Sequence, residues 1–109
     1  MLKLIAVLII GMLPAATNLW AADGEVLFKS LHCRSCHTVK GSKFTPGLKQ
    51  ISEVYHGKEK QLTDYLKGES EAIIKPEKEG IMKRYIEKTK SLSNEDLQAL
   101  IDFLMSHNK

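Results

Sequence analysis

Cysteine is scarce in this chain of 109 residues, which contains only two, Cys33 and Cys36. Two cysteines cannot supply a four-cysteine zinc site, and His32, His56 and His107 form no second pair of ligands beside them. The sequence also lacks runs of alternating apolar and polar residues, internal repeats and low-complexity segments. These absences exclude zinc modules, sheets and repeat arrays, and they leave one small all-α domain.

The N-terminal segment differs from the rest of the chain. A lysine at position 3 precedes an apolar run over residues 4–13, and Pro14 and small residues follow. This order is typical of a secretory signal peptide, so we expect a signal peptide over 1–21, a folded domain over 22–109 and a periplasmic location. The alternative is an uncleaved membrane anchor, because residues 4–22 carry no charge and about 20 apolar residues span a bilayer.

Apolar residues recur at helical spacing after the leader. The spacing predicts helices over 23–31, around 48–55 and around 62–66, and a last helix after Ser93. Val26, Leu27 and Leu31 are expected on one side of the first helix. Ser93 is a suitable N-cap for the last helix, with an aspartate at the third position. The segment between 76 and 93 is expected to be a loop.

The sequence Cys33-Arg34-Ser35-Cys36-His37 is a C-x-x-C-H motif, which attaches a c-type haem. Two thiols at this spacing can form thioether bonds to both vinyl groups of one porphyrin, and His37 follows as the proximal iron ligand. A thioredoxin-like redox pair would need a strand before the motif, but residues 25–32 indicate a helix. The motif therefore predicts one covalent haem c, held through Cys33 and Cys36.

The second axial position decides the function, because a protein ligand there makes an electron carrier and an open position makes a gas binder. Met82 is the favoured ligand, since it lies far from His37 in the sequence and the chain can wrap around the haem. The alternative is that Met82 only fills the core. The other candidates are Met105, His32, His56, His107 and a lysine.

Several features together resemble a small bacterial class I monohaem cytochrome c, of the short soluble type found in thermophilic hydrogen-oxidising bacteria. They are Gly24 and Phe28 before the motif, the turn Thr45-Pro46-Gly47-Leu48, the late Met82 and the capped last helix. The resemblance covers nearly the whole mature chain. It implies the class I cytochrome c fold, with short helices wrapped around one haem and the first and last helices crossing at Gly24.

The resemblance also implies roles for the Thr45–Leu48 turn. Pro46 would offer its carbonyl group to His37, and Pro46 and Leu48 would belong to the haem-binding residues. The sequence departs from the family in two ways: Lys83 instead of proline follows Met82, and the only tryptophan lies in the leader. Three residues could replace a tryptophan beside a haem propionate, namely Tyr55, Tyr85 and Arg84.

These observations predict an electron carrier with axial ligands His37 and Met82, and no enzyme. The alternatives are a gas-binding or sensor protein with an open sixth position, or a haem subunit of a larger redox complex. Expected partners are redox proteins with acidic docking patches, and neither nucleic acid nor stable membrane insertion after cleavage is expected. We expect a monomer with a basic rim near the haem edge. The rim comprises Arg34, Lys40, Lys43, Lys49, Lys83, Arg84, Lys88 and Lys90.

Overall fold

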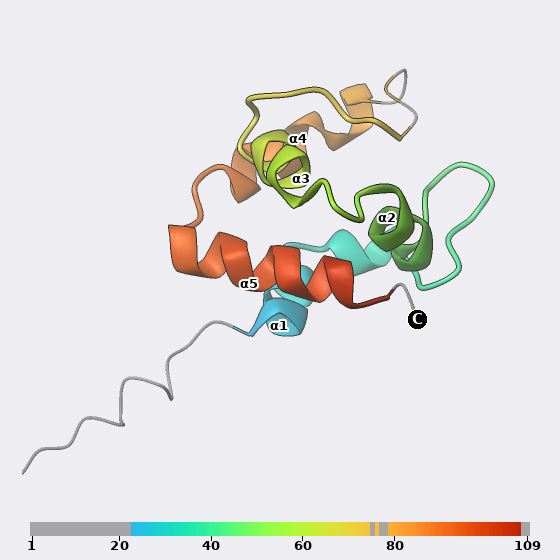
Figure 1. Ribbon diagram of the computed structural model, residues 1–109, viewed down its shortest axis with the longest axis horizontal. Coiled ribbons are helices and arrows are strands. Elements are labelled where there is room, and N and C mark those ends of the chain that lie inside the picture. The colour runs from blue at the N-terminus through green and yellow to red at the C-terminus, as the bar shows by residue number, and fades with distance from the viewer. Residues whose placement is uncertain (1–22, 75, 77–78, 108–109) are drawn as a thin grey trace, which may run out of the picture.

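The computed structural model describes residues 23–74, 76 and 79–107 (Figure 1). The signal peptide predicted over 1–21 lies outside these residues. Over the described ranges the chain contains helices and no β-strand, so the all-α prediction is confirmed. None of the helices in these ranges is long and apolar enough to cross a membrane. The elements are α1 (Gly24–Ser30), η2 (Cys33–Ser35), α2 (Leu48–Val54), α3 (Glu59–Leu66), α4 (Glu79–Thr89), α5 (Asn94–Leu104) and η4 (Met105–His107).

The first and last α-helices, α1 and α5, lie against each other (Figure 1). Gly24 makes this approach possible, because a Cβ atom there would collide with the backbone oxygen of Ala99 and lie 2.7 Å from the Cβ atom of Phe103. The rings of Phe28 and Phe103 meet beside it, with centroids 5.2 Å apart. The helix crossing that the resemblance implied is therefore present.

Capping side chains set the beginnings of these two helices. The Asp23 carboxylate accepts hydrogen bonds from the backbone N–H groups of Glu25 and Val26, and the Ser93 hydroxyl accepts one from Asp96. All three bonds satisfy donors that have no partner within the helix. The side predicted for the first helix was partly wrong, because Val26 is 59% exposed and the buried residue of α1 is Phe28.

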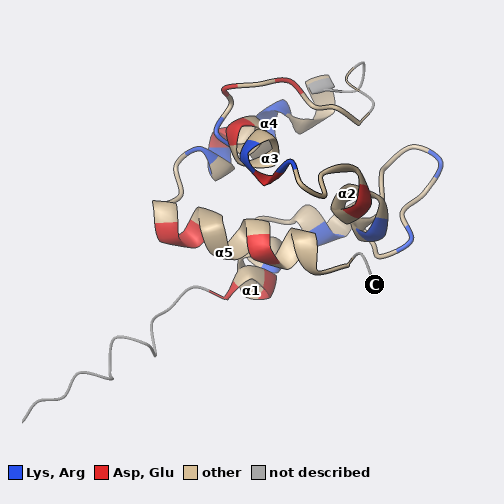
Figure 2. Ribbon diagram, in the orientation of Figure 1, with Lys and Arg blue, Asp and Glu red and all other residues tan. Residues whose placement is uncertain are grey.

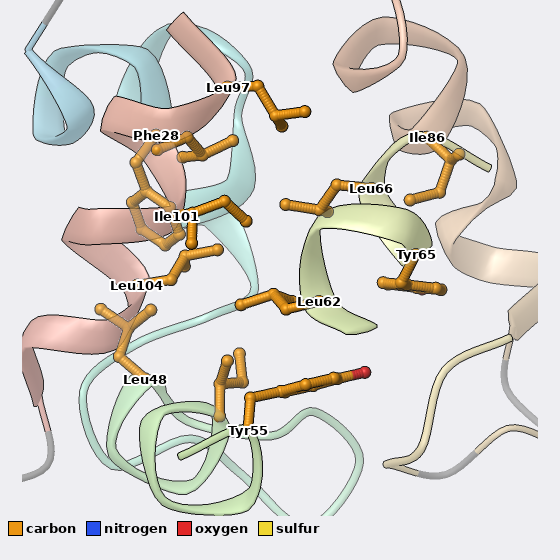
Figure 3. Packing of buried hydrophobic residues seen from close by; sticks show 12 residues of the cluster. Phe28, Leu48, Tyr55, Leu62, Tyr65, Leu66, Ile86, Leu97, Ile101 and Leu104 are labelled. Atoms are coloured by element: carbon orange, nitrogen blue, oxygen red, sulfur yellow. The ribbon is translucent and has the colours of Figure 1, made fainter. Parts of the chain in front are cut away.

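Helix α3 lies between two groups of side chains (Figure 3). Leu62 and Leu66 point toward α5, whereas Tyr65 points toward α4. All three are buried. Helix α3 therefore joins the α1–α5 crossing to α4, and residues from all of these helices line one cavity.

Residues 79–89 form the helix α4, where a loop was expected. Met82, Ile86 and Thr89 recur at intervals of four and three, so they share one face of the helix. Ile86 and Thr89 are buried and Met82 is half-buried. Five charged residues among positions 83–90 weakened the apolar pattern in the sequence. The buried face of α4 is a stripe only one residue wide, so its helical pattern is weak in the sequence. Packing against α3 is enough to stabilise such a narrow face.

Candidate functional site

One open cavity of about 1160 Å³, part of it open to solvent, lies between the helices. Carbon-rich side chains form most of the wall, so the cavity favours an apolar ligand. The lining residues most relevant to chemistry are Cys33, Cys36, His37, Met82, His32, Thr45, Pro46, Tyr55, Tyr65, Tyr85 and Thr89.

The imidazole ring of His37 has a defined orientation and tautomer. Its Nδ1 atom lies 2.9 Å from the carbonyl oxygen of Pro46. A carbonyl oxygen can only accept, so Nδ1 carries the proton and donates it in this bond. The Nε2 atom of the neutral ring then holds the lone pair that a metal ion would bind.

Backbone hydrogen bonds hold the turn that presents Pro46. The N–H group of Leu48 donates to Thr38 O at 2.8 Å, and that of Ser42 donates to Thr45 O at 2.8 Å. Gly47 is tightly enclosed, because a Cβ atom there would collide with the backbone of Lys40. The acceptor for His37 therefore lies on a backbone segment that cannot easily move.

The two cysteines lie at the two ends of η2, before the Pro46 turn in the sequence. Cys33 begins η2 and is half-buried, whereas Cys36 follows η2 and is exposed; no disulfide joins them. His32 before them adopts a left-handed backbone conformation, with φ of 64°. Burial raises the pKa of the Cys33 thiol, and a backbone hydrogen bond and the charge of Lys88 partly oppose this shift. Lys88 on α4 therefore lies close enough to act on the attachment segment.

The structure separates the candidates for the second axial ligand. Met82 lines the cavity from α4, and His32 lines it beside the attachment cysteines. Met105 and His107 lie in η4 and are not part of the cavity wall. His56 is exposed and is also not part of the wall. Among the candidate sulfur and imidazole groups, Met82 is the one that an element other than the attachment segment brings to the cavity.

Two further results concern residues of the predicted site. Leu48 is buried in the core and is not among the residues that line the cavity, so the structure does not bring it to the site. Arg84 is exposed and also does not line the cavity, whereas Tyr55 and Tyr85 do. The Tyr55 hydroxyl accepts a hydrogen bond from Ile73 N at 3.3 Å.

Sequence reasoning missed several wall residues. Helical spacing identified Leu62, Tyr65 and Leu66 as apolar but could not show whether they face the core or a cavity. Thr89 was not singled out, and no local signal marks it. The missed wall residues also include Phe44, Ala72, Ile74 and Ile81.

The family model described as "Cytochrome c" matches residues 21–108, which is most of the chain. No curated protein gives a significant match. The matched range contains the C-x-x-C-H motif, the Pro46 turn and Met82, and it begins next to the predicted cleavage site.

Proposed function

The chain belongs to the cytochrome c family and carries covalent haem c, and from this premise we propose that it is a periplasmic one-electron carrier with axial ligands His37 and Met82. The family supports haem-based electron transfer. The single observation that carries the finer proposal is the cavity itself, because its wall includes the attachment motif and also Met82. These groups come from elements that are far apart in the sequence.

The residues of this cavity fit a haem. Cys33 and Cys36 have the required spacing, and His37 keeps Nε2 for a metal because Nδ1 is bound to Pro46. Imidazole nitrogen and thioether sulfur are an established axial pair for haem iron in electron carriers. The predominantly apolar wall would cover the porphyrin faces.

When bound, haem c supplies the reversible one-electron change of its iron. The residues of the chain keep the surroundings constant during that change. Pro46 holds the His37 ring through the 2.9 Å hydrogen bond, and Met82 offers a polarisable sulfur from α4. The apolar wall excludes water, which favours the less charged ferrous state and raises the reduction potential. We assign no acid, base or nucleophile to this chain.

The spectrum of the Met82→Ala holoprotein tests the ligation. Sulfur ligation of ferric haem gives a weak absorption band near the red end of the visible spectrum. We expect this band in the wild type and its loss in Met82→Ala. Met105→Ala is the matched control, since Met105 is half-buried outside the cavity wall and its loss should leave the band intact.

Carbon monoxide distinguishes the alternative function. A gas-binding or sensor protein with an open sixth position would bind carbon monoxide rapidly in the native ferrous form. We expect slow binding in the wild type and rapid binding in Met82→Ala. Rapid binding by the wild type, together with an absent sulfur band, would refute the proposed carrier.

Charge distribution supports a proposal about partners. The segment 34–49 contains no acidic residue, and α4 carries two lysines and one arginine beside two glutamates, whereas α5 carries three acidic residues and no basic one (Figure 2). Such a separation of charge can steer encounter with an acidic partner. We expect the reduction rate with an acidic redox partner to fall as ionic strength rises; an insensitive rate would exclude steering by the basic rim.

Export is proposed on the leader pattern, and the family match that begins at residue 21 supports the boundary. We expect a monomeric mature protein in the periplasm. N-terminal sequencing of the holoprotein tests this expectation, because an intact Met1 would indicate a retained membrane anchor instead of a cleaved signal peptide.

A further inference from the structure

We propose that Thr89 is a positioning residue, whose hydroxyl group fixes α4 against α3 and thereby keeps Met82 at the cavity. This inference rests on the proposed His37 and Met82 ligation. Thr89 is the last residue of α4 and is only 2% exposed. A polar side chain so deeply buried needs a hydrogen-bond partner, and the identity of that partner shows its role.

The partner belongs to another helix. Thr89 Oγ1 donates to the carbonyl oxygen of Leu66 at 2.6 Å, and the carbonyl oxygen of Ile86 lies 3.2 Å away as a second acceptor. Leu66 is the last residue of α3, where carbonyl groups have no partner within their own helix. The bond to Leu66 therefore joins the C-terminal ends of α3 and α4 and satisfies a helix-end acceptor.

Thr89 and Met82 lie on the same face of α4. They are seven residues apart, which is about two helical turns. Both residues line the cavity, and Ile86 lies between them on that face. A rotation of α4 about its axis would move Met82 away from the cavity and would also break the bond between Thr89 and Leu66. The bond therefore resists the motion that would withdraw the sulfur.

Packing alone does not provide this constraint. The contribution of Ile86 is hydrophobic and non-directional, so it tolerates small rotations and shifts of the helix. A hydrogen bond requires a narrow range of distance and angle. Thr89 is thus the group on α4 that converts loose contact with α3 into a defined orientation of the face that carries Met82.

Imidazole binding to the ferric holoprotein tests the proposal, because imidazole competes with Met82 for the iron. Thr89→Val keeps the shape of the side chain and removes the hydroxyl group. We expect the affinity for imidazole to rise about tenfold, which corresponds to about 1.4 kcal/mol and lies within the cost of a lost buried hydrogen bond. The sulfur band should weaken, and Thr89→Ser should restore both properties.

Ser52→Ala is the matched control. Ser52 is fully buried, and its Oγ donates to Met105 O at 2.9 Å, outside the cavity wall. This variant should lower the melting temperature and leave the imidazole affinity unchanged. Should Thr89→Val not accumulate as holoprotein, Thr89→Ala removes the same hydroxyl group and carries the same expectation.

The outcomes separate the two proposals. An unchanged imidazole affinity in Thr89→Val, or an equal rise in Ser52→Ala, would overturn the positioning role of Thr89. A wild-type holoprotein without the sulfur band would instead refute the ligation by Met82, and this result is obtained before any Thr89 variant is compared.

Discussion

Helices α4 and α5 are both 11 residues long, but the fold anchors them very differently. Helix α5 buries four apolar side chains and lies against α1. Among its described side chains, α4 buries only Ile86 and Thr89. Equal length therefore does not mean equal stability, because the free energy of a helix in a protein comes mainly from the face that it buries.

The same contrast applies to the two proposed iron ligands. His37 lies in a segment fixed by the Pro46 carbonyl and by backbone bonds, and its neighbours Cys33 and Cys36 hold the haem covalently. Met82 lies on the weakly anchored α4. We therefore expect disturbances of the chain to release the sulfur before they release the imidazole.

The largest effect should come from removal of the cofactor, which both regions share. The Cys33→Ala/Cys36→Ala chain without haem should be largely unfolded, since water would enter a cavity whose wall is apolar. Thermal melting followed by circular dichroism, beside the haem-loaded wild type, measures this. A cooperative, native-like transition in the apo variant would show that the α1–α5 region folds on its own.

A valine in place of glycine compares the α1–α5 crossing with α4. Gly24→Val should lower the free energy of unfolding by about 1–3 kcal/mol, because the new side chain collides with α5. Gly80→Val on α4 is the control, since an added Cβ atom there meets nothing within 4 Å; a change of roughly 0.5 kcal/mol or less is expected. Similar denaturation midpoints for both variants would contradict the close crossing.

The smallest effect is expected from shortening one buried isoleucine on α5 and one on α4. Ile→Val typically costs about 0.5–1.5 kcal/mol. Ile101→Val on α5 should lie near the upper value, because Ile101 is 1% exposed, and Ile86→Val on α4 near the lower value, because Ile86 is 9% exposed. Urea denaturation of both holoproteins gives the difference. A larger loss in Ile86→Val would reverse the proposed order of anchoring.

The sequence predicted the helices that have a clear cap or a clear apolar pattern, and it did not predict α4, whose apolar pattern is weak. The cap at Ser93 is local, so residue types alone revealed where α5 begins. Helix α4 was missed, because its buried face is a narrow stripe among charged residues. The resemblance alone assigned Leu48 to the haem-binding residues, and this assignment stays a prediction; the structure buries Leu48 in the core, and it is not among the residues that line the cavity.

Five consecutive residues by themselves determined the cofactor, because thioether attachment depends only on two thiols and an imidazole at close spacing. The sequence favoured Met82 as the second ligand, but only the tertiary structure showed that this residue lines the cavity and that the Thr89 hydroxyl group bonds to α3. Met82 shares a cavity with the attachment motif, and Thr89 bonds to α3, only because the fold packs together segments that are far apart in the chain. Contacts of that kind depend on the folded arrangement of whole helices, which residue spacing within one segment does not encode.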